Sequence, residues 1–240
     1  VNGETKVTAG TLVDTVKTDA DGKATSKELY LGEYLVKELT APKDYVLSDE
    51  EHIVTLEYKG QEVEIYSTSL KVTDTVQKGI IAIQKKGEVL TDVEKTESDY
   101  GEILTPIYEK RYLADAEYEI YADEDIIVNG ETKVTAGTLV DTVKTAENEP
   151  VSSKQLYLGK YKVVEKTAPN GFVLNNTAYS VELTYQGQEI SVFTENLVIE
   201  NERQKVSVSF NKTMEENIYY PDADAYKEVV FGIYVKEDII

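Results

Sequence analysis

Apolar and polar positions alternate through the stretch from Leu29 to Leu47, which reads LYLGEYLVKELTAPKDYVL. Alternation with a period of two predicts a β-strand, and the Ala-Pro pair after it predicts a turn. Because alternate side chains of a strand share a face, Tyr34, Val36 and Glu38 are predicted to point the same way. A carboxylate on an apolar face is costly without a partner, so we expect Glu38 to have one.

The same pattern recurs from Leu156 to Leu174, which reads LYLGKYKVVEKTAPNGFVL, at an offset of 156 − 29 = 127 residues. In this copy Tyr161, Val163 and Glu165 share the face. Residues 1–18 also recur unchanged, as 128–145. The chain is therefore expected to consist of tandem copies of one β-unit.

The repeat predicts three domain segments. Residues 80–205 form one complete repeat, residues 206–240 begin the next one, and residues 1–79 are the C-terminal part of a split repeat. Since the residue after Ile127 matches Val1, the two ends of the chain are predicted to be complementary. The chain is then either one period of a longer polypeptide, which we favour, or a separate subunit that polymerises by strand complementation.

Composition supports an all-β fold, because the chain is rich in Val, Thr, Ile and Tyr in short alternating runs. The net charge of −20 makes nucleic acid and anionic membrane surfaces improbable partners. No apolar run approaches the length of a membrane span. The absence of cysteine excludes disulfides and thiol catalysis, and no metal or cofactor is expected.

Strand parity places further polar residues on apolar faces. Lys85 shares a face with two isoleucines, and Asn201 shares one with a leucine and an isoleucine. The equivalent residues of the split repeat are Lys212 and Asp74. Each complete repeat thus brings a lysine, a glutamate and an Asn or Asp towards one core, where separate burial is costly.

Together these three groups could form an amide bond between the lysine amine and the Asn or Asp side-chain carbonyl. Burial lowers the pKa of a lysine, which makes the amine neutral and nucleophilic, and raises that of a carboxylic acid, which keeps it protonated. The fold would hold the reactants in contact. Asn201 would release ammonia and Asp74 would release water. The alternative is that these are ordinary strand residues with surface ion pairs.

The unit resembles the collagen-adhesin B-type and SpaA-type prealbumin-like domains of Gram-positive surface proteins. The resemblance rests on IIAIQKK with Lys85, ADAEYEIYADEDI, LYLGKYKVVEKTAPNGF with Glu165, and LVIEN with Asn201. It implies tandem Ig-like β-sandwiches with spontaneous isopeptide bonds. By this resemblance Lys85 and Asn201 are cross-linked with Glu165 as catalytic acid; Lys212, Asp74 and Glu38 take these positions in the split repeat.

The predicted function is structural: a repeat segment of an extracellular stalk or fibre on a Gram-positive cell, from a wall-anchored parent protein. Its expected partners are neighbouring copies of itself, head to tail. The competing hypothesis is an adhesin that binds a host or matrix ligand, and a long insertion, Gly87 to Arg111, favours it. An enzyme acting on an external substrate is the weakest hypothesis.

Overall fold

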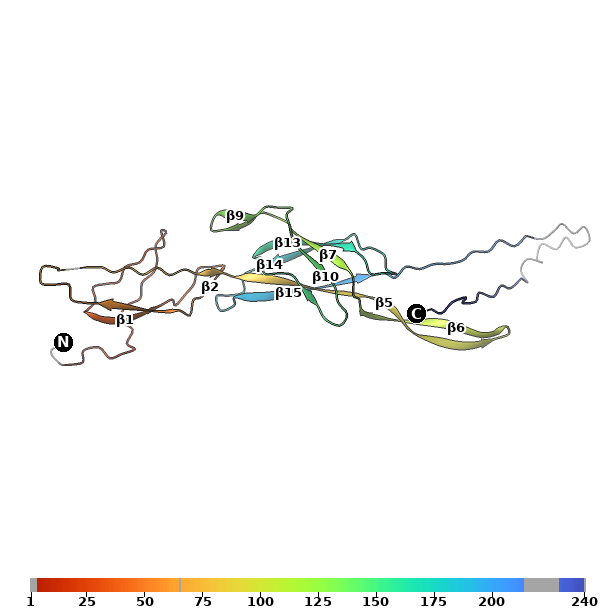
Figure 1. The fold of residues 1–240 in the computed structure, drawn as a ribbon, viewed down its shortest axis with the longest axis horizontal. Helices are drawn as coiled ribbons and strands as arrows, with labels where there is room; N and C mark the ends of the chain where they lie inside the picture. The colour runs from red at the N-terminus through yellow and green to blue at the C-terminus, as the bar shows by residue number, and fades with distance from the viewer. Residues whose placement is uncertain (1–3, 65, 214–228, 240) are drawn as a thin grey trace, which may run out of the picture. The chain divides into compact units, whose positions relative to one another are not determined.

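The computed structural model describes residues 4–64, 66–213 and 229–239, and Figure 1 shows their fold. They fall into two compact units, one within residues 1–203 and one within residues 204–240. The described residues contain strands and no helix, which confirms the all-β prediction. The strands are β1 (Gly32–Lys37), β2 (Tyr45–Val46), β3 (Glu51–Leu56), β4 (Thr75–Val76), β5 (Lys78–Ser98), β6 (Gly101–Tyr112), β7 (Glu117–Ala122), β8 (Ile126–Val128), β9 (Glu131–Val134), β10 (Leu139–Lys144), β11 (Val151–Ser152), β12 (Leu156–Tyr157), β13 (Gly159–Thr167), β14 (Ala178–Leu183) and β15 (Val192–Asn201).

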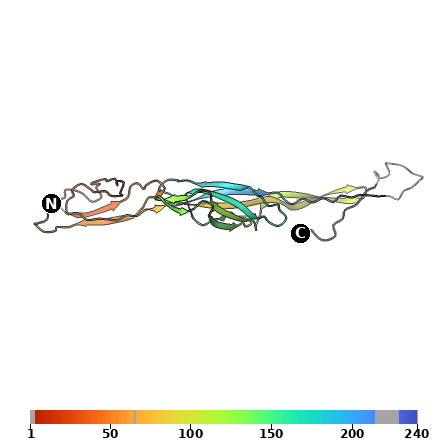
Figure 2. The ribbon, with the colours of Figure 1, turned by 90° about the horizontal axis from the view of Figure 1, so that it is seen from above.

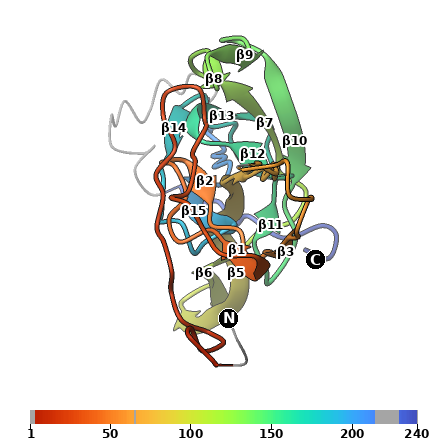
Figure 3. The same ribbon diagram turned by 90° about the vertical axis from the view of Figure 1, so that its left-hand side faces the viewer.

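Residues 80–203 form a sandwich of two sheets. One sheet has the strand order β10-β7-β13-β14, and in the other β5 pairs with β6, β11, β12 and β15. Figure 3 shows the two layers from the end. The core between them holds apolar side chains from both sheets, among them Ile81, Ile83, Ile120 and Val163. The alternation of apolar positions thus gives each sheet one buried face, as expected for a sandwich.

The first and last strands of this repeat are neighbours. Strand β15 pairs with β5 in parallel, with Ile199 opposite Lys85 and Asn201 opposite Gly87. Residues far apart in the sequence therefore lie side by side at the end of the sandwich. Because Ile199 and Asn201 share a face with Lys85, their side chains meet in the same layer.

The insertion after Lys86 forms a long hairpin. Strands β5 and β6 stay paired from Lys86 with Tyr112 to Ser98 with Gly101, with one register shift between Leu90 and Asp92. Figures 1 and 2 both show the hairpin continuing beyond the sandwich. Several of its apolar side chains are exposed, including Tyr100.

Residues 4–79 repeat the second half of this sandwich without its first half. Strands β1 and β3 pair in the register of β13 and β14, with Tyr34 opposite Val54 as Tyr161 is opposite Val181. The inward face lacks a cover: Val36 is 42% exposed, whereas its equivalent Val163 is 0% exposed. The segment therefore has the local structure of the repeat and only part of its core.

The unit within residues 204–240 shows the complementary deficit. Phe210 and Phe231 stack with ring centroids 4.9 Å apart, yet both are about half exposed. Their equivalents in the complete repeat, Ile83 and Tyr118, are fully buried in one core. In residues 4–64, 66–213 and 229–239 there is no helix with the length and hydropathy needed to cross a bilayer.

Candidate functional site

Lys85 is a buried lysine in the sandwich core. Strand parity places it on the face of Ile81 and Ile83, and its side chain is inaccessible to solvent. Its Nζ lies 3.0 Å from Glu165 Oε1 and 5.6 Å from the centre of the Tyr118 ring. Burial lowers the pKa of the Lys85 amine, and the hydrogen bond and charge of Glu165 oppose this effect. The site thus favours a neutral amine more than water does.

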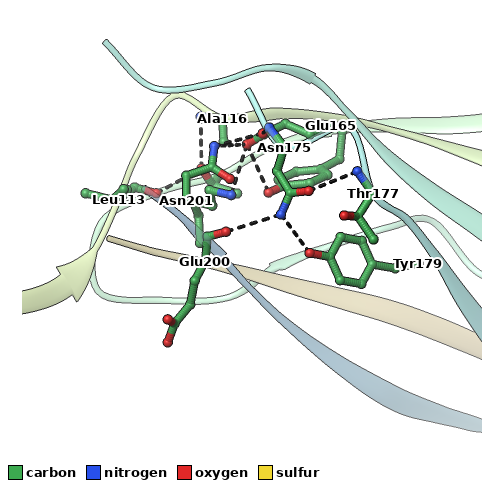
Figure 4. Close-up of polar contacts among 11 residues, drawn as sticks. Leu113, Ala116, Glu165, Asn175, Thr177, Tyr179, Glu200 and Asn201 are labelled. Atoms are coloured by element: carbon green, nitrogen blue, oxygen red, sulfur yellow. Dashed lines mark hydrogen bonds and ion pairs between the residues drawn. The ribbon is translucent and has the colours of Figure 1, made fainter. Parts of the chain in front are cut away.

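Glu165 enters the same core from the opposite sheet. It shares the inward face of β13 with Tyr161 and Val163, and its side chain is fully buried. Its two oxygens accept hydrogen bonds from Asn201 Nδ2 at 2.9 and 2.8 Å, and Oε2 also accepts one from the backbone N–H of Asn175 at 2.7 Å. Figure 4 shows Asn201 and Asn175 on the carboxylate. Glu165 is therefore in contact with both proposed cross-link partners.

Asn201 ends strand β15 and is 7% exposed. Its Oδ1 is buried and finds no hydrogen-bond donor among the described residues. An amide oxygen without a donor in a core costs free energy. A protonated Glu165 removes this deficit if the amide turns over, because the acid then donates to Oδ1 and polarises the carbonyl.

Two further contacts of Glu165 were not predicted from the sequence. The Tyr118 hydroxyl donates to Oε1 at 3.2 Å, and burial followed by the charge of Glu165 raises the Tyr118 pKa well above its ordinary value. The other contact is the Asn175 N–H, which no side-chain pattern can reveal. The signal for Tyr118 is its parity with Ile120 in the alternating run EYEIYA.

Close packing at Gly87 seals the site. A Cβ on Gly87 would lie 2.4 Å from Cε1 of Phe172 and 2.7 Å from Cδ1 of Leu113. Gly87 is the residue opposite Asn201 in the β5–β15 ladder. The lack of a side chain therefore lets Phe172 and Leu113 close over the end of the core beside Asn201.

The predicted site residues of the split repeat are divided between the two units. Glu38 is half-buried, and its Oε2 accepts a hydrogen bond from the Ser48 N–H at 2.9 Å, as Glu165 does from Asn175. Asp74 is half-buried, and Lys212 is exposed in the other unit. The carboxylate thus has its backbone partner in both copies, whereas a buried lysine accompanies only Glu165.

Other candidates for chemistry are weaker. Lys86, the lysine next to Lys85 in β5, has its Nζ 4.9 Å from the centre of the Tyr112 ring. Among the described residues no cluster of three or more His, Asp or Glu side chains could hold a metal ion. The complete repeat can therefore bring one amine, one acid and one amide together, which is the set needed for condensation with loss of ammonia.

A comparison with known families decides the relationship. The SpaA prealbumin-like fold domain matches residues 1–71 and 107–198. The chain belongs to this family. Both SpaA matches end at equivalent positions, since 198 − 71 = 127, which is the repeat offset. The matched ranges do not include Lys85, Asn201, Asp74 or Lys212, so they do not bear on the cross-link.

Solved structures show weaker likenesses to this chain. The Bacillus anthracis TIE protein is 22% identical with a TM-score of 0.49, covering 78% of this chain and 28% of its own. The minor pilin GBS52 of Streptococcus agalactiae is 18% identical with a TM-score of 0.34, and the match covers 82% of this chain and 71% of the pilin. The C-terminal fragment of the pilus adhesin SpaC from Lactobacillus rhamnosus GG is 13% identical with a TM-score of 0.36, covering 78% and 84%. No curated protein matches the chain.

Proposed function

We propose that this chain is a structural segment of an extracellular stalk or fibre on a Gram-positive cell, and that an isopeptide bond joins Lys85 to Asn201. The observation that carries the proposal is the contact of Glu165 with both residues. Its Oε1 lies 3.0 Å from Lys85 Nζ and 2.9 Å from Asn201 Nδ2 inside the core. The proposed role is thus mechanical, with no external substrate.

The proposed reaction needs only these three side chains. The neutral Lys85 amine attacks Cγ of Asn201 while protonated Glu165 donates to the amide. The Nζ–Cγ bond forms, the Cγ–Nδ2 bond breaks, and ammonia leaves with the proton released by the amine. Glu165 relays that proton and ends as it began. Burial favours the reacting form of the amine, because it disfavours the charged form of Lys85.

Intact mass under denaturing conditions tests the bond. The chain should weigh one ammonia less than its sequence, and Glu165→Ala should restore the full mass. Glu38→Ala is the matched control, because Glu38 has the same backbone partner and no buried lysine beside it. A wild-type chain of unmodified mass would exclude the Lys85–Asn201 bond.

We further propose that successive copies complete each other head to tail. Residues 206–240 of one copy would cover residues 1–79 of the next, whether within one polypeptide or between subunits. The exposed faces support this: Val36 and Phe210 are 42% and 53% exposed, whereas Val163 and Ile83 at the equivalent positions are buried. An unpaired sheet edge beside an open apolar face is an aggregation hazard that a neighbour removes.

Completion would assemble the second cross-link site. Lys212 would join the half-buried Glu38 and Asp74. The condensation would release water, because Asp74 has a carboxyl oxygen where Asn201 has an amide nitrogen. Peptide mapping of a polypeptide of two successive copies tests this. A Lys212–Asp74 cross-linked peptide between the copies is expected; finding both residues unmodified would exclude the second bond.

The β5–β6 hairpin supports a second candidate function, a ligand-binding adhesin. Its tip exposes Tyr100, Ile103 and Leu104, each at least half exposed. Removing residues 91–107 should leave the mass deficit of the repeat intact. If that deletion also abolishes attachment of the chain to a host matrix surface, the adhesin function is supported; unchanged attachment excludes the hairpin from it.

A further inference from the structure

A buried glutamine connects the split repeat to the complete one. Gln77 lies just before β5 and is 1% exposed. Its Nε2 donates to the carbonyl oxygens of Gly187 and Ile190, and its Oε1 accepts from the Gln186 N–H at 2.7 Å. The amide is thus bound on both sides by one turn of the complete repeat. A buried polar side chain bound this way fixes the orientation of its partners.

Backbone contacts beside Gln77 join the same two repeats. The Leu47 N–H donates to the Gln188 carbonyl oxygen at 2.8 Å, and the Ala41 N–H donates to Gln188 Oε1 at 2.9 Å. The Gln77 N–H donates to the Asp44 carbonyl oxygen at 2.9 Å, which ties the glutamine to the Ala-Pro segment. We call residues 41–47 with Gln77 the plug, and residues 185–190 the socket.

The sequence contains counterparts of the plug and of the socket. The repeat offset of 127 makes Gln204 the equivalent of Gln77. By the same offset, residues 168–174 are equivalent to 41–47, and residues 58–63 to 185–190. Gln204 and Gln61 are exposed, unlike the engaged Gln77. The counterpart of the plug thus belongs to the complete repeat and its C-terminal end, and the counterpart of the socket belongs to the split repeat.

The second socket already has the shape of the first. Gly60 and Gly187 have φ of +102° and +103°. The Val63 N–H donates to the Gly60 carbonyl oxygen, and the Ile190 N–H donates to the Gly187 carbonyl oxygen, each at 3.3 Å. Residues 168–174 also share a backbone feature with residues 41–47, because Gly171 has φ of +81° where Asp44 has +73°. A preformed socket lowers the ordering cost of binding.

We propose that the socket at residues 58–63 binds the plug of a second copy of this chain, formed by its Gln204 and residues 168–174. Each junction then repeats the contacts seen at Gln77, which fixes the orientation of one repeat on the next. The proposal rests on the head-to-tail part of the proposed function. It does not require the isopeptide bond.

Amide hydrogen exchange by NMR tests the engaged junction in the full chain. Gln77→Ala removes the acceptor of the Gln186 N–H, so the protection of this amide should fall by about tenfold or more. Gln204→Ala is the matched control and should leave Gln186 unchanged, because Gln204 is exposed. Equal protection of Gln186 in wild type and Gln77→Ala would remove the role of Gln77.

A second measurement is needed because Gln77→Ala can also loosen residues 4–79. Gln188→Ala removes the acceptor of the Ala41 N–H, so the protection of the Ala41 amide is measured, with Gln61→Ala as the control.

A polypeptide of two successive copies tests the new interface. Lys59 stands where Gln186 stands in the engaged socket, since 186 − 127 = 59. Its amide should be about tenfold more protected in the second copy than in the first, and Gln204→Ala in the first copy should abolish the difference. Equal protection of both Lys59 amides, or protection that survives Gln204→Ala, would overturn the proposal. Intact mass of the same samples reports the isopeptide bonds separately, so failure of the bond and failure of the plug are distinguishable.

Discussion

Val163 and Val36 occupy equivalent positions in two copies of one sequence, yet one is buried and the other is 42% exposed. Both stand on a strand paired in the same register with its neighbour. The difference is the presence of β5, β7 and β15 around the first valine. Local sequence is therefore enough to form the hairpin-like pair, whereas the core forms only where the first and the last strands of the repeat pair as well.

The two carboxylates show the same contrast. Glu165 and Glu38 both accept a backbone N–H ten residues further along, so the strand and its Ala-Pro turn position each of them. Only Glu165 has a buried amine and a buried amide against it. The chemistry of the site thus depends on strands contributed by the two ends of the repeat.

The largest expected effect comes from Lys85→Ala. The proposed bond closes a loop of 201 − 85 = 116 residues, which the chain-entropy model values at about 5 kcal/mol. In single-molecule pulling, Lys85→Ala should release these residues, which extend by about 400 Å, whereas the wild-type repeat should not release them. Lys212→Ala is the control and should behave as wild type. Full extension of the wild-type repeat would contradict the mechanical function.

A smaller effect should separate the two equivalent valines. Val163→Ala removes two buried methyl groups and should lower the free energy of unfolding by about 2–3 kcal/mol. Val36→Ala should change it by less than about 0.5 kcal/mol, because the side chain is already partly in water. Denaturant unfolding followed by tyrosine fluorescence measures both, since the chain has no tryptophan. Equal losses would mean that Val36 is covered in solution.

Alternation of apolar residues was enough to predict the strands and the buried faces around Glu165. It placed Tyr161, Val163 and Glu165 on one face, and all three are buried. It could not predict that β15 joins β5 in parallel, because pairing of distant strands depends on the whole fold. The meeting of Lys85 and Asn201 follows from that pairing, so the sequence argument for it needed the family resemblance.

Other features escaped the pattern for different reasons. The insertion from Gly87 to Arg111 was recognised as long, but its hairpin structure was missed because its strands mix charged and apolar residues on both faces. The plug and socket were missed because their contacts are mostly backbone groups, which every residue carries. Gln77 itself reads as one more polar residue before a strand. The assignments of Lys212, Glu38 and Asp74 as reacting groups stay predictions.

The pH dependence of stability should depend on whether the bond exists. In Glu165→Gln, which should lack the bond, Lys85 stays a buried amine with a pKa below its ordinary 10.5. At pH values between the lowered pKa of Lys85 in the folded chain and its pKa of 10.5 in the unfolded chain, the unfolded chain binds one proton more. The free energy of unfolding should therefore rise with pH in this range, by at most about 1.4 kcal/mol per pH unit, and level off above 10.5. The bonded wild type should lack this rise, because an amide does not titrate. Denaturant titrations from neutral to alkaline pH measure it, with Glu165→Gln/Lys85→Met as control; an equal rise in that control would contradict the assignment to Lys85.

The smallest expected effect comes from Tyr118→Phe, which gives the complete repeat the residue that the split repeat has at this position. Residues 231–240 (FGIYVKEDII) align with residues 118–127 (YEIYADEDII) at an offset of 238 − 125 = 113, so Phe231 stands where Tyr118 stands. At this position the completed split site would have no hydroxyl beside its glutamate. Tyr118→Phe keeps the ring in the core and removes one long hydrogen bond to Glu165, of 3.2 Å. The carboxylate keeps its bonds to the Asn175 N–H and to Asn201. We therefore expect the mass deficit of one ammonia to persist, because Glu165 still contacts both Lys85 and Asn201. The free energy of unfolding should fall by about 1 kcal/mol.

Tyr161→Phe is the matched control, because its buried hydroxyl donates to the Tyr157 carbonyl oxygen at 2.7 Å, away from Glu165. If Tyr118→Phe alone restores the full mass, the hydroxyl takes part in the reaction, and Phe231 would then leave the split repeat without its cross-link.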